Sequence, residues 1–433
     1  MTFVELPGAV PRAGVAVPPS PTARARTVRF TGSGRAYLRL LARGAVLLAL
    51  TLGIYRFWLT TDMRRFLWVN TEVDGDSLEY TGTAIELLIG FLIGMAILVP
   101  LYVGLFVLAL NLGVIGQFIG ILAFPVLAYL GHFAIYRARR YRLTRTVYRG
   151  IRFHQGGSAL LYAVYALLWW ILIIVTLGLA YPFAQASLER FKMKHTYFGN
   201  LRGRFDGSGF RLFWRGLSMW LAVVGPLIAA IVIPIAAIDW SNAATAFSSD
   251  PEAFMRRLTT ANPDLVKTFG IAIAVANLSI MFAVLLYPVF QAVVMRWWIE
   301  GLRIGDVAIG SQLSVGTIYY GYVRFVGWSL LFSLVVVIAG VIGAIALVGL
   351  GLSFGSKQTT EIVGTIGAVG LYVIVMLGYS TIYQVTAKLT LWRHAVESAT
   401  IGNLAALTDV KAEGVPSSAL GEGLADALNV GGI

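Results

Sequence analysis

The sequence predicts an all-α polytopic membrane protein, and three observations carry that prediction. Of 433 residues, 58% are hydrophobic and 13% are charged, whereas a soluble domain has about 45–50% apolar and about 25% charged residues. The mean hydropathy is +0.77. The apolar residues are also grouped, because six windows longer than twenty residues contain no Asp, Glu, Lys or Arg. Such windows are typical of membrane-spanning helices, which need about 20 apolar residues.

The two ends of the chain lack this pattern. Residues 1–29 are expected to form a disordered basic tail and not a signal peptide, because prolines interrupt them and no continuous apolar stretch is present. The absence of cysteine excludes disulfides, thiolate metal sites and thiol nucleophiles. The expected organisation continues with a membrane repeat over 30–152, a second repeat over 153–299, a C-terminal pair of membrane helices over 300–400 and a cytoplasmic tail over 401–433.

The charge-free windows predict six crossings of the membrane. The window 87–136 is long enough for two helices, with a break near Asn111 and Gly113. One helix each is expected in 216–238, 268–295, 325–356 and 362–387. Two windows do not fit a single span: 44–55 has only 12 uncharged residues, and 153–188 has 36.

Comparison of the sequence with itself predicts a tandem repeat of about 125 residues. The sequence Thr-Leu-Gly at 51–53 recurs at 176–178, and each copy is followed twelve residues later by Arg-Phe. In the helix that follows, a glycine and a proline recur at an offset of 126 residues. A smaller unit, with a basic amphipathic stretch and a glycine-punctuated polar segment, recurs more weakly at 129–157 and 287–316, and again from Tyr379.

Short β-hairpins are predicted where the apolar windows end. Turn residues and mixed alternation place them at Val69–Tyr80, Val147–His154 and Asn200–Phe205. Each membrane exit is therefore expected to continue as an amphipathic helix along the surface, turn in a cytoplasmic hairpin and re-enter the membrane.

Arginine-rich runs set the expected orientation. The positive-inside rule places the N-terminal tail, the run 137–152 with seven arginines, and the basic stretch 190–215 in the cytoplasm. The loop 239–267 has a net charge of −1 and is expected outside. Both termini are then cytoplasmic.

This orientation conflicts with simple span counting at the two odd windows. Keeping every basic run inside requires an even number of crossings between runs. The windows 44–55 and 153–188 are therefore predicted to be re-entrant helical hairpins that turn at Gly53 and Gly178 and are packed within the bundle. The alternative is that both are ordinary spans, which gives eight crossings and places 137–152 outside.

The first odd window lies in a distinctive order of arginine, aromatic and glycine residues. The residues are Leu50-Thr-Leu-Gly-Ile-Tyr-Arg-Phe-Trp58, Arg64-Arg-Phe66, Asn70-Thr71, Gly75 and Glu79-Tyr-Thr-Gly-Thr83, with Phe30-Thr-Gly-Ser-Gly34 before them and Thr176-Leu-Gly178 in the second copy. This pattern resembles a bacterial membrane-protein family of unknown function typified by YjgN, over about 30–100 and 153–235 and more weakly towards the C-terminus. The resemblance implies a bacterial inner-membrane protein with an all-helical core, and it supplies no catalytic residue.

No catalytic constellation can be assembled from the sequence. The four histidines (His132, His154, His195 and His394) are scattered, and no metal-binding spacing, P-loop or dinucleotide fingerprint stands in the required context. The middles of the expected spans hold no ionisable residue, which disfavours ion-coupled transport. Glu86, at the start of its helix, is a candidate polar site, although the helix dipole explains it more simply. The chain is expected to be non-enzymatic, with no cofactor, metal or nucleic-acid partner.

Basic residues interleaved with aromatic ones form a candidate contact surface for anionic lipid headgroups. The candidate residues are Arg137, Arg139, Arg140, Arg190, Lys192, Arg202 and Arg204. Topology alone explains the same residues more simply.

The leading hypothesis is an inner-membrane protein that handles or transports lipid, or another amphipathic molecule, within the bilayer. Its expected partners are membrane lipids with anionic headgroups. One alternative is a membrane scaffold that recruits proteins through its basic cytoplasmic hairpins, and another is a channel or solute transporter. The sequence specifies neither a substrate nor an oligomeric state.

Overall fold

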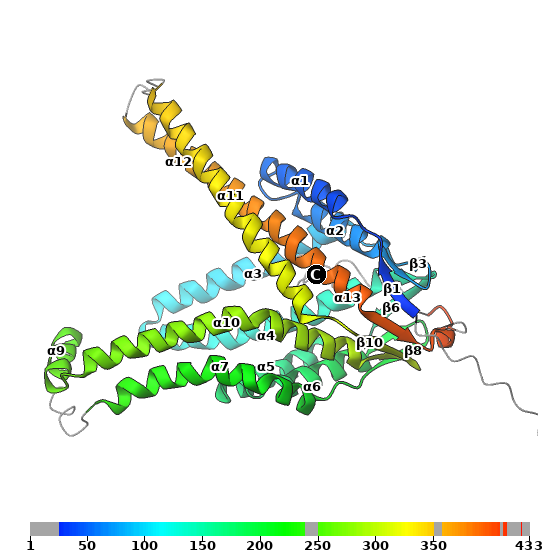
Figure 1. Ribbon diagram of the computed structural model, residues 1–433, viewed down its shortest axis with the longest axis horizontal. Helices are drawn as coiled ribbons and strands as arrows, with labels where there is room; N and C mark the ends of the chain where they lie inside the picture. Colours follow the sequence, from blue (N-terminus) through cyan, green and yellow to red (C-terminus); the bar gives the residue numbers. More distant parts are fainter. Residues whose placement is uncertain (1–25, 239–249, 350–356, 408–409, 414–425, 427–433) are drawn as a thin grey trace, which may run out of the picture.

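The computed structural model describes residues 26–238, 250–349, 357–407, 410–413 and 426, and its helices extend from one end of the molecule, where the strands gather (Figure 1). The strands are β1 (Arg26–Phe30), β2 (Thr71–Val73), β3 (Asp76–Ser77), β4 (Glu79–Tyr80), β5 (Thr146–Tyr148), β6 (Ile151–Gln155), β7 (Thr196–Phe198), β8 (Leu201–Phe205), β9 (Leu302–Ile304), β10 (Val307–Ser311) and β11 (Ala399–Gly402). The helices are α1 (Gly34–Leu50), α2 (Arg56–Val69), α3 (Ala84–Asn111), α4 (Gly113–Thr144), α5 (Ala159–Val175), α6 (Tyr181–Lys194), α7 (Gly209–Ala236), α9 (Pro251–Ala261), α10 (Leu265–Gly301), α11 (Val315–Gly349), α12 (Lys357–Tyr383), the π-helix η1 (Gln384–Lys388), α13 (Leu389–Glu397) and the 3₁₀-helix η2 (Leu404–Leu407).

Long apolar helices account for most of the expected membrane spans. Five stretches of the described chain are long and apolar enough to cross a membrane: Ala84–Asn111, Gly209–Ala236, Leu265–Gly301, Val315–Gly343 and Gly364–Glu397. They fall in five of the six places where the charge-free windows predict a crossing. The second half of the window 87–136 forms α4, a helix of 32 residues.

The strands form one 11-stranded antiparallel sheet, in the order β3-β2-β1-β11-β10-β9-β8-β7-β6-β5-β4. Strands occur at the three places where hairpins are predicted, as β2–β3, β5–β6 and β7–β8. The expectation of an all-α fold with separate hairpins is nevertheless wrong, because hydrogen bonds between the hairpins join them into a single sheet. Residues 26–29, assigned above to the tail, belong to β1 in that sheet.

The sheet closes into a ring. Its two end strands, β3 and β4, are consecutive parts of one chain segment and are separated only by Leu78. One part pairs with β2 and the other with β5. Because the N-terminal strand β1 also pairs with the C-terminal strand β11, the ring brings together the two ends of the described fold.

Five successive segments of the chain share the order strand, helix, helix, strand. They are β1–α1–α2–β2, β4–α3–α4–β5, β6–α5–α6–β7, β8–α7–α10–β9 (with α9 between its helices) and β10–α11–α12–β11 (with η1 and α13 after α12). The two strands of each segment pair with one another. Each outgoing helix starts after a serine or threonine whose hydroxyl accepts a backbone N–H, at Ser33, Thr83, Ser158, Ser208 and Ser314.

In each segment, an arginine on the helical part that returns to the sheet donates a hydrogen bond to a backbone carbonyl of the next segment. The five donor–acceptor pairs are Arg65 to Gly82, Arg140 to Gly157, Arg190 to Gly207, Arg296 to Leu313 and Arg393 to Gly32. In every pair the accepting carbonyl belongs to the residue before a helix-capping serine or threonine. Four of the pairs are separated by 17 residues in sequence, and the fifth links the last segment to the first. We refer to these five residues as the ring arginines.

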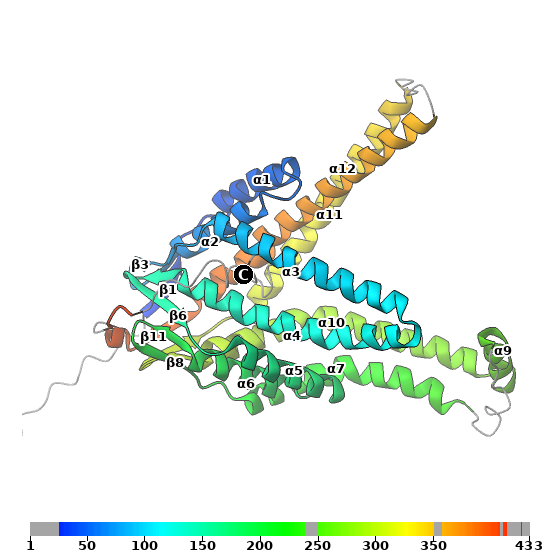
Figure 2. The same ribbon diagram turned by 180° about the vertical axis from the view of Figure 1, so that it is seen from behind.

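The helical segments differ in length and direction. Helices α1 and α5 have 17 residues each, whereas the pairs α3–α4, α7–α10 and α11–α12 reach much farther from the sheet (Figures 1 and 2). In both views α11 and α12 diverge from α7 and α10 as they leave the ring (Figure 2). Within 315–343 and 364–397, the most apolar 18-residue windows contain no buried residue.

Candidate functional site: a buried charged cluster

A cluster of charged side chains lies where the returning helices α2, α4 and α6 approach the sheet. Its members are Arg64, Arg139, Arg142, Glu189, Lys192 and Asp426, and we call them the charged cluster. They come from three segments of the ring and from the C-terminal tail. Charged groups are rarely buried unless they are paired, so the cluster is the part of the described chain that packing alone explains least.

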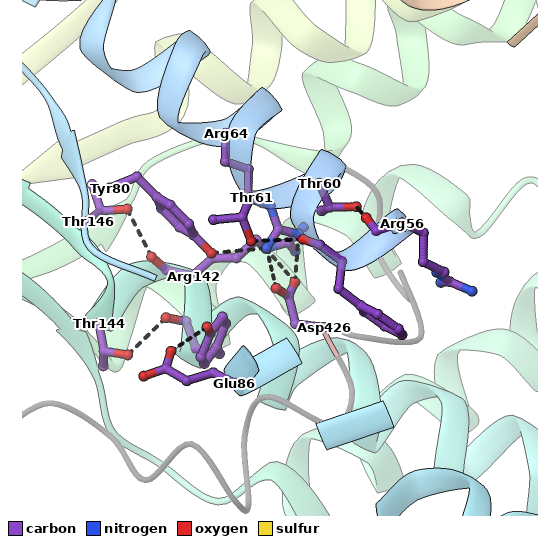
Figure 3. Close-up of polar contacts among 12 residues, drawn as sticks. Arg56, Thr60, Thr61, Arg64, Tyr80, Glu86, Arg142, Thr144, Thr146 and Asp426 are labelled. Carbon is purple, nitrogen blue, oxygen red and sulfur yellow. Dashed lines mark hydrogen bonds and ion pairs between the residues drawn. The ribbon is translucent and has the colours of Figure 1, made fainter. Parts of the chain in front are cut away.

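The centre of the cluster is the pair formed by Arg64 and Asp426 (Figure 3). Arg64 donates two hydrogen bonds to the Asp426 carboxylate, one of them from Nη2 to Oδ1 at 3.0 Å. Both side chains are only 1% exposed. Arg64 also donates to the Tyr80 hydroxyl at 3.1 Å, and Nε of Arg142 lies 3.6 Å from Asp426 Oδ1. Two guanidinium groups and a phenol therefore converge on one carboxylate.

Glu86, the candidate polar site at the start of α3, lies beside this pair. Its carboxylate accepts a hydrogen bond from the Tyr141 hydroxyl at 2.7 Å and forms an ion pair with Arg145 at 2.9 Å. Figure 3 places it on the opposite side of Arg142 from Tyr80. Glu86 therefore has specific partners on α4 and at its C-terminal cap, in addition to the dipole of its own helix.

Arg139, Glu189 and Lys192 extend the cluster towards the third segment. Glu189 accepts a hydrogen bond from Lys192 one turn later on α6, and both side chains are mostly buried. Arg139 donates to Gln155 Oε1 at 2.6 Å and to Thr196 Oγ1 at 2.8 Å. Its charge also interacts with those of Glu189 and Arg142, so Arg142 links the two halves of the cluster.

The cluster holds more positive than negative charge. Four cationic side chains face two carboxylates. Burial lowers the pKa of Lys192, although Glu189 opposes that shift. Burial acts in the same direction on Arg64, but the attraction of Asp426 outweighs it and the pKa of Arg64 is raised. The site is thus a pre-formed positive environment that favours oxyanions.

The lowered pKa of Lys192 predicts a pH dependence of stability. In the unfolded chain Lys192 has its ordinary pKa of 10.5, and in the folded chain the pKa is lower. Between these two pKa values, Lys192 is protonated in the unfolded chain and largely deprotonated in the folded chain. Stability should therefore rise with pH in the alkaline range up to 10.5. Thermal unfolding of the wild type and of Lys192→Met in detergent checks this, because the difference between them isolates the lysine. A difference that stays flat or has the opposite slope would contradict the assignment.

Metal binding finds no support in the described residues, since these contain no group of three or more His, Asp or Glu side chains placed to hold an ion. The expected absence of a metal site remains a prediction for the chain as a whole.

Four of the seven candidate headgroup residues belong to the ring contacts or to the charged cluster. Arg140 and Arg190 are ring arginines, and Arg139 and Lys192 belong to the charged cluster. The three arginines donate to acceptors on neighbouring segments, and Lys192 donates to Glu189 on its own helix. In these positions they hold the fold together and shape its interior.

Of the other three candidates, Arg202 and Arg204 are exposed and Arg137 is half-buried. The guanidinium of Arg137 lies 5.6 Å from the centre of the Phe133 ring. Arg202 is exposed and donates to the Lys194 carbonyl at 2.7 Å. Arg204 is 71% exposed and forms an ion pair with Asp206 at 2.8 Å. Arg137 belongs to α4, and Arg202 and Arg204 belong to β8.

Gly53 and Gly178 lie in the turns of the short hairpins α1–α2 and α5–α6. Their φ angles are +95° and +94°, a region that only glycine adopts without strain. Thr51 and Thr176 stabilise the two turns in the same way, since each hydroxyl donates to a carbonyl four residues earlier and accepts an N–H four residues later. The chain therefore turns where the repeated Thr-Leu-Gly predicts it.

Cavities adjoin both hairpins. A cavity of about 60 Å³ beside Gly178 is lined mainly by apolar side chains, including Leu212, Phe213 and Phe290. An open cavity of about 310 Å³ near the first turn has a mixed lining of Arg39, Leu40, Arg43, Tyr55, Leu59 and Asp62. The first is too small for a whole lipid, so at most part of an acyl chain fits there.

Replacing Gly178 with alanine should destabilise the α5–α6 hairpin by about 1–2 kcal/mol, because an L-residue is strained at this positive φ. The added methyl group itself meets little, since the nearest atom, Trp220 Nε1, is 3.5 Å away. Gly225→Ala is a matched control: it lies inside α7 with nothing within 4 Å. Thermal midpoints in detergent compare the two variants. Equal midpoints would show that the turn is not strained.

The sequence does not single out four members of the charged cluster as site residues: Arg64, Arg142, Glu189 and Asp426. Arg64 and Arg65 are adjacent and look equivalent, yet one enters the cluster and the other is a ring arginine. Asp426 lies 362 residues from Arg64, and nothing in its local sequence sets it apart. The one usable signal was the spacing of 17 residues between each ring arginine and a Gly-Ser or Gly-Thr step, which holds for Arg65, Arg140 and Arg190.

Comparison with known proteins gives a family and no function. Residues 25–427 match the model of a family described as bacterial protein of unknown function (DUF898). No curated protein matches the chain, and no solved structure does.

Proposed function

The chain belongs to this bacterial family of unknown function, and from that premise we propose that it is an inner-membrane protein that binds and moves an anionic lipid, or another amphipathic anion, within the bilayer. The observation that carries the proposal is the excess of positive charge in the buried cluster, at the sheet end of long apolar helices. An amphipathic anion would suit this arrangement, because its anionic headgroup can bind the arginines and its apolar tail can lie along the apolar helices.

The separation of the long helices supports a role for lipid. The most apolar windows of α11 and α12 contain no buried residue. Apart from the face on which the two helices contact one another, their surface is therefore available to acyl chains. In a bilayer, lipid would then fill the space between this pair and the pair α7–α10 farther from the ring, beyond the contacts that Tyr319 and Tyr322 make with α10. Loosely packed helices of this kind favour lateral entry of lipid over a sealed aqueous pore.

We further propose that the ring and both termini are cytoplasmic and that the short hairpins are re-entrant. Strands β6 and β7 pair with one another, so the chain between them starts and ends at the same sheet, which supports six crossings over eight. The tips are apolar, with Leu52 94% exposed. Since the chain has no cysteine, Ser77→Cys and Arg149→Cys can test the sidedness. An impermeant maleimide should label both from the cytoplasmic side, whereas labelling of either site from the periplasmic side would contradict the topology.

We also infer that the five strand–helix–helix–strand segments are copies of one unit. The ring arginines and the capping Ser or Thr support this, because both recur in every segment at the same place. The repeat of about 125 residues would then correspond to two units. In related sequences, the five arginines should be retained together; independent loss of single members would speak against a common unit.

Reconstitution in liposomes tests the lipid proposal. Purified protein should accelerate transbilayer movement of a fluorescent phosphatidylglycerol relative to protein-free vesicles. Arg142→Gln should slow it by about tenfold or more, because a charge-assisted hydrogen bond contributes about 1.5–3 kcal/mol. Arg211→Gln is the matched control, because Arg211 is exposed at the start of α7 and belongs to none of the candidate sites, and it should leave the rate unchanged. Solute or ion flux without lipid movement would favour a channel, and neither activity would favour a scaffold.

A further inference from the structure

We propose that Arg64 and Arg142 form a binding site for a phosphate group, and that Asp426 of the C-terminal tail occupies this site as an internal competitor. The inference rests on the proposed function, because it names the chemical group that the charged cluster recognises. The phosphate can come from a lipid headgroup or from the free anion, and the experiment below separates these sources.

The donors of the site are fixed by the fold and are mostly buried. Arg64 is anchored on α2 with a side chain 1% exposed, and Arg142 is anchored on α4 with a side chain 17% exposed. Tyr80 contributes a hydroxyl from β4. The Nε of Arg64 has no hydrogen-bond partner among the described residues. A guanidinium fork of this kind matches the oxygens of a carboxylate or phosphate equally well.

The present occupant differs from the donors in how it is attached. Asp426 reaches the site from a point 362 residues along the chain from Arg64, and it belongs to neither a ring strand nor a returning helix. Its carboxylate makes the same bidentate contact that an external oxyanion would make. Asp426 therefore stands where a ligand oxyanion would bind.

Charge favours phosphate over the aspartate. With Asp426 bound, four cations of the cluster face two carboxylates, so positive charge remains in excess. A phosphate monoester carries about −1.5 to −2 at neutral pH and so offsets more of the excess than a single carboxylate does. Asp426 can therefore pair with the two arginines when no ligand is bound and be displaced by an anion of higher charge. The apparent affinity for that anion is then reduced by the fraction of molecules in which Asp426 is bound.

Removal of the competitor tests the proposal. In the full-length protein in detergent, Asp426→Ala should have a lower thermal midpoint than the wild type in phosphate-free buffer, because the buried Arg64 loses its carboxylate. Inorganic phosphate should restore the midpoint and bind the variant about tenfold or more tightly than the wild type. Asp426→Asn keeps the side-chain shape and should show the same gain if Asp426→Ala does not fold. Asp206→Asn, which removes an exposed carboxylate, should show none.

The double variant Arg142→Gln/Asp426→Ala locates the site. This variant should not bind phosphate more tightly than the wild type, because the second arginine of the site has been removed. The proposal is overturned if the double variant still binds phosphate more tightly than the wild type. It is also overturned if neither Asp426 variant binds inorganic phosphate or a phosphate headgroup more tightly than the wild type does.

Two arms distinguish the source of the phosphate. One uses nanodiscs of phosphatidylcholine with added inorganic phosphate, and the other uses nanodiscs that contain phosphatidic acid, whose headgroup is a phosphate monoester. A gain in the midpoint of Asp426→Ala in the second arm alone identifies a lipid headgroup, and a gain in the first identifies the free anion. These readouts do not depend on lipid movement. If the wild type moves lipid but the Asp426 variants bind phosphate no more tightly than the wild type, the proposed function stands and the phosphate site is rejected. If the Asp426 variants bind phosphate more tightly but the wild type moves no lipid, the phosphate site stands and the proposed function is rejected.

Discussion

Replacing Glu189 with glutamine is expected to lower the free energy of unfolding by about 3–5 kcal/mol, the range observed when one partner of a buried ion pair is removed. Glu189 is only 6% exposed, and its carboxylate faces both Lys192 and Arg139. Without it, two buried cations lose their nearest negative charge while remaining fixed on α4 and α6. Titration with sodium dodecyl sulfate in mixed micelles, followed by circular dichroism, measures the loss.

Two further variants separate this cause from general disruption. The exposed pair Arg204–Asp206 supplies the control, because Arg204→Gln should cost no more than about 1 kcal/mol. The double variant Glu189→Met/Lys192→Met removes both charges and should recover much of the stability lost by Glu189→Gln. A double variant less stable than the single one would show that the side chains matter for packing and not for charge balance.

Replacing Arg393 with methionine is expected to open the closure of the ring at a cost of about 1.5–3 kcal/mol, the contribution of a hydrogen bond that involves a charged group. Arg393 donates to the Gly32 carbonyl at 2.5 Å and lies over the Phe30 ring. It is the only ring arginine that joins the last of the five described segments to the first. Strands β1 and β11 should therefore exchange their amide hydrogens faster than the rest of the sheet.

Hydrogen exchange in detergent, resolved by peptide, compares this variant with Arg211→Met. Arg211 is exposed at the start of α7, and its replacement should leave the ring unchanged. Arg393→Lys keeps the charge and should restore part of the protection. Uniform exchange over all strands in Arg393→Met would show that closure does not depend on this contact.

The membrane helices and the two glycine turns could be predicted because their signals are local. An apolar window longer than 20 residues has few alternatives to a spanning helix, whatever the rest of the chain does. The turns at Gly53 and Gly178 were located because Thr-Leu-Gly occurs twice at a fixed offset. Even the hairpins carried local turn signals, such as Asp74-Gly75 and Arg149-Gly150, where both residues have positive φ.

The ring could not be predicted from the sequence, because its strands have 2–5 residues and little apolar alternation. Strand pairing between hairpins is non-local, and the pair Arg26–Ile401 joins opposite ends of the sequence. Short strands have no sequence pattern that names a distant partner. Only the assembled fold shows that β1, counted with the N-terminal tail, completes a sheet with β11.

The roles of the arginines were assigned incompletely for a related reason. Arg137, Arg139, Arg140 and Arg142 lie within two turns of α4, and the same residue type serves at a membrane surface, in a buried ion pair or at a helix end. Spacing places Arg139 and Arg142 on one face, but the sequence does not show what that face meets. The packing of α2, α4 and α6 decides that it meets Arg64, Glu189 and Asp426.

The sequence by itself determined that this protein has long apolar helices, where they lie, and where the short hairpins turn, because burying apolar surface and positive φ at glycine are properties of a short stretch of chain. The tertiary structure alone decided that five hairpin segments close into one ring and that a tail aspartate reaches two arginines. Charge pairing in a buried site depends on distances between residues far apart in sequence, and those distances exist only once the ring has formed.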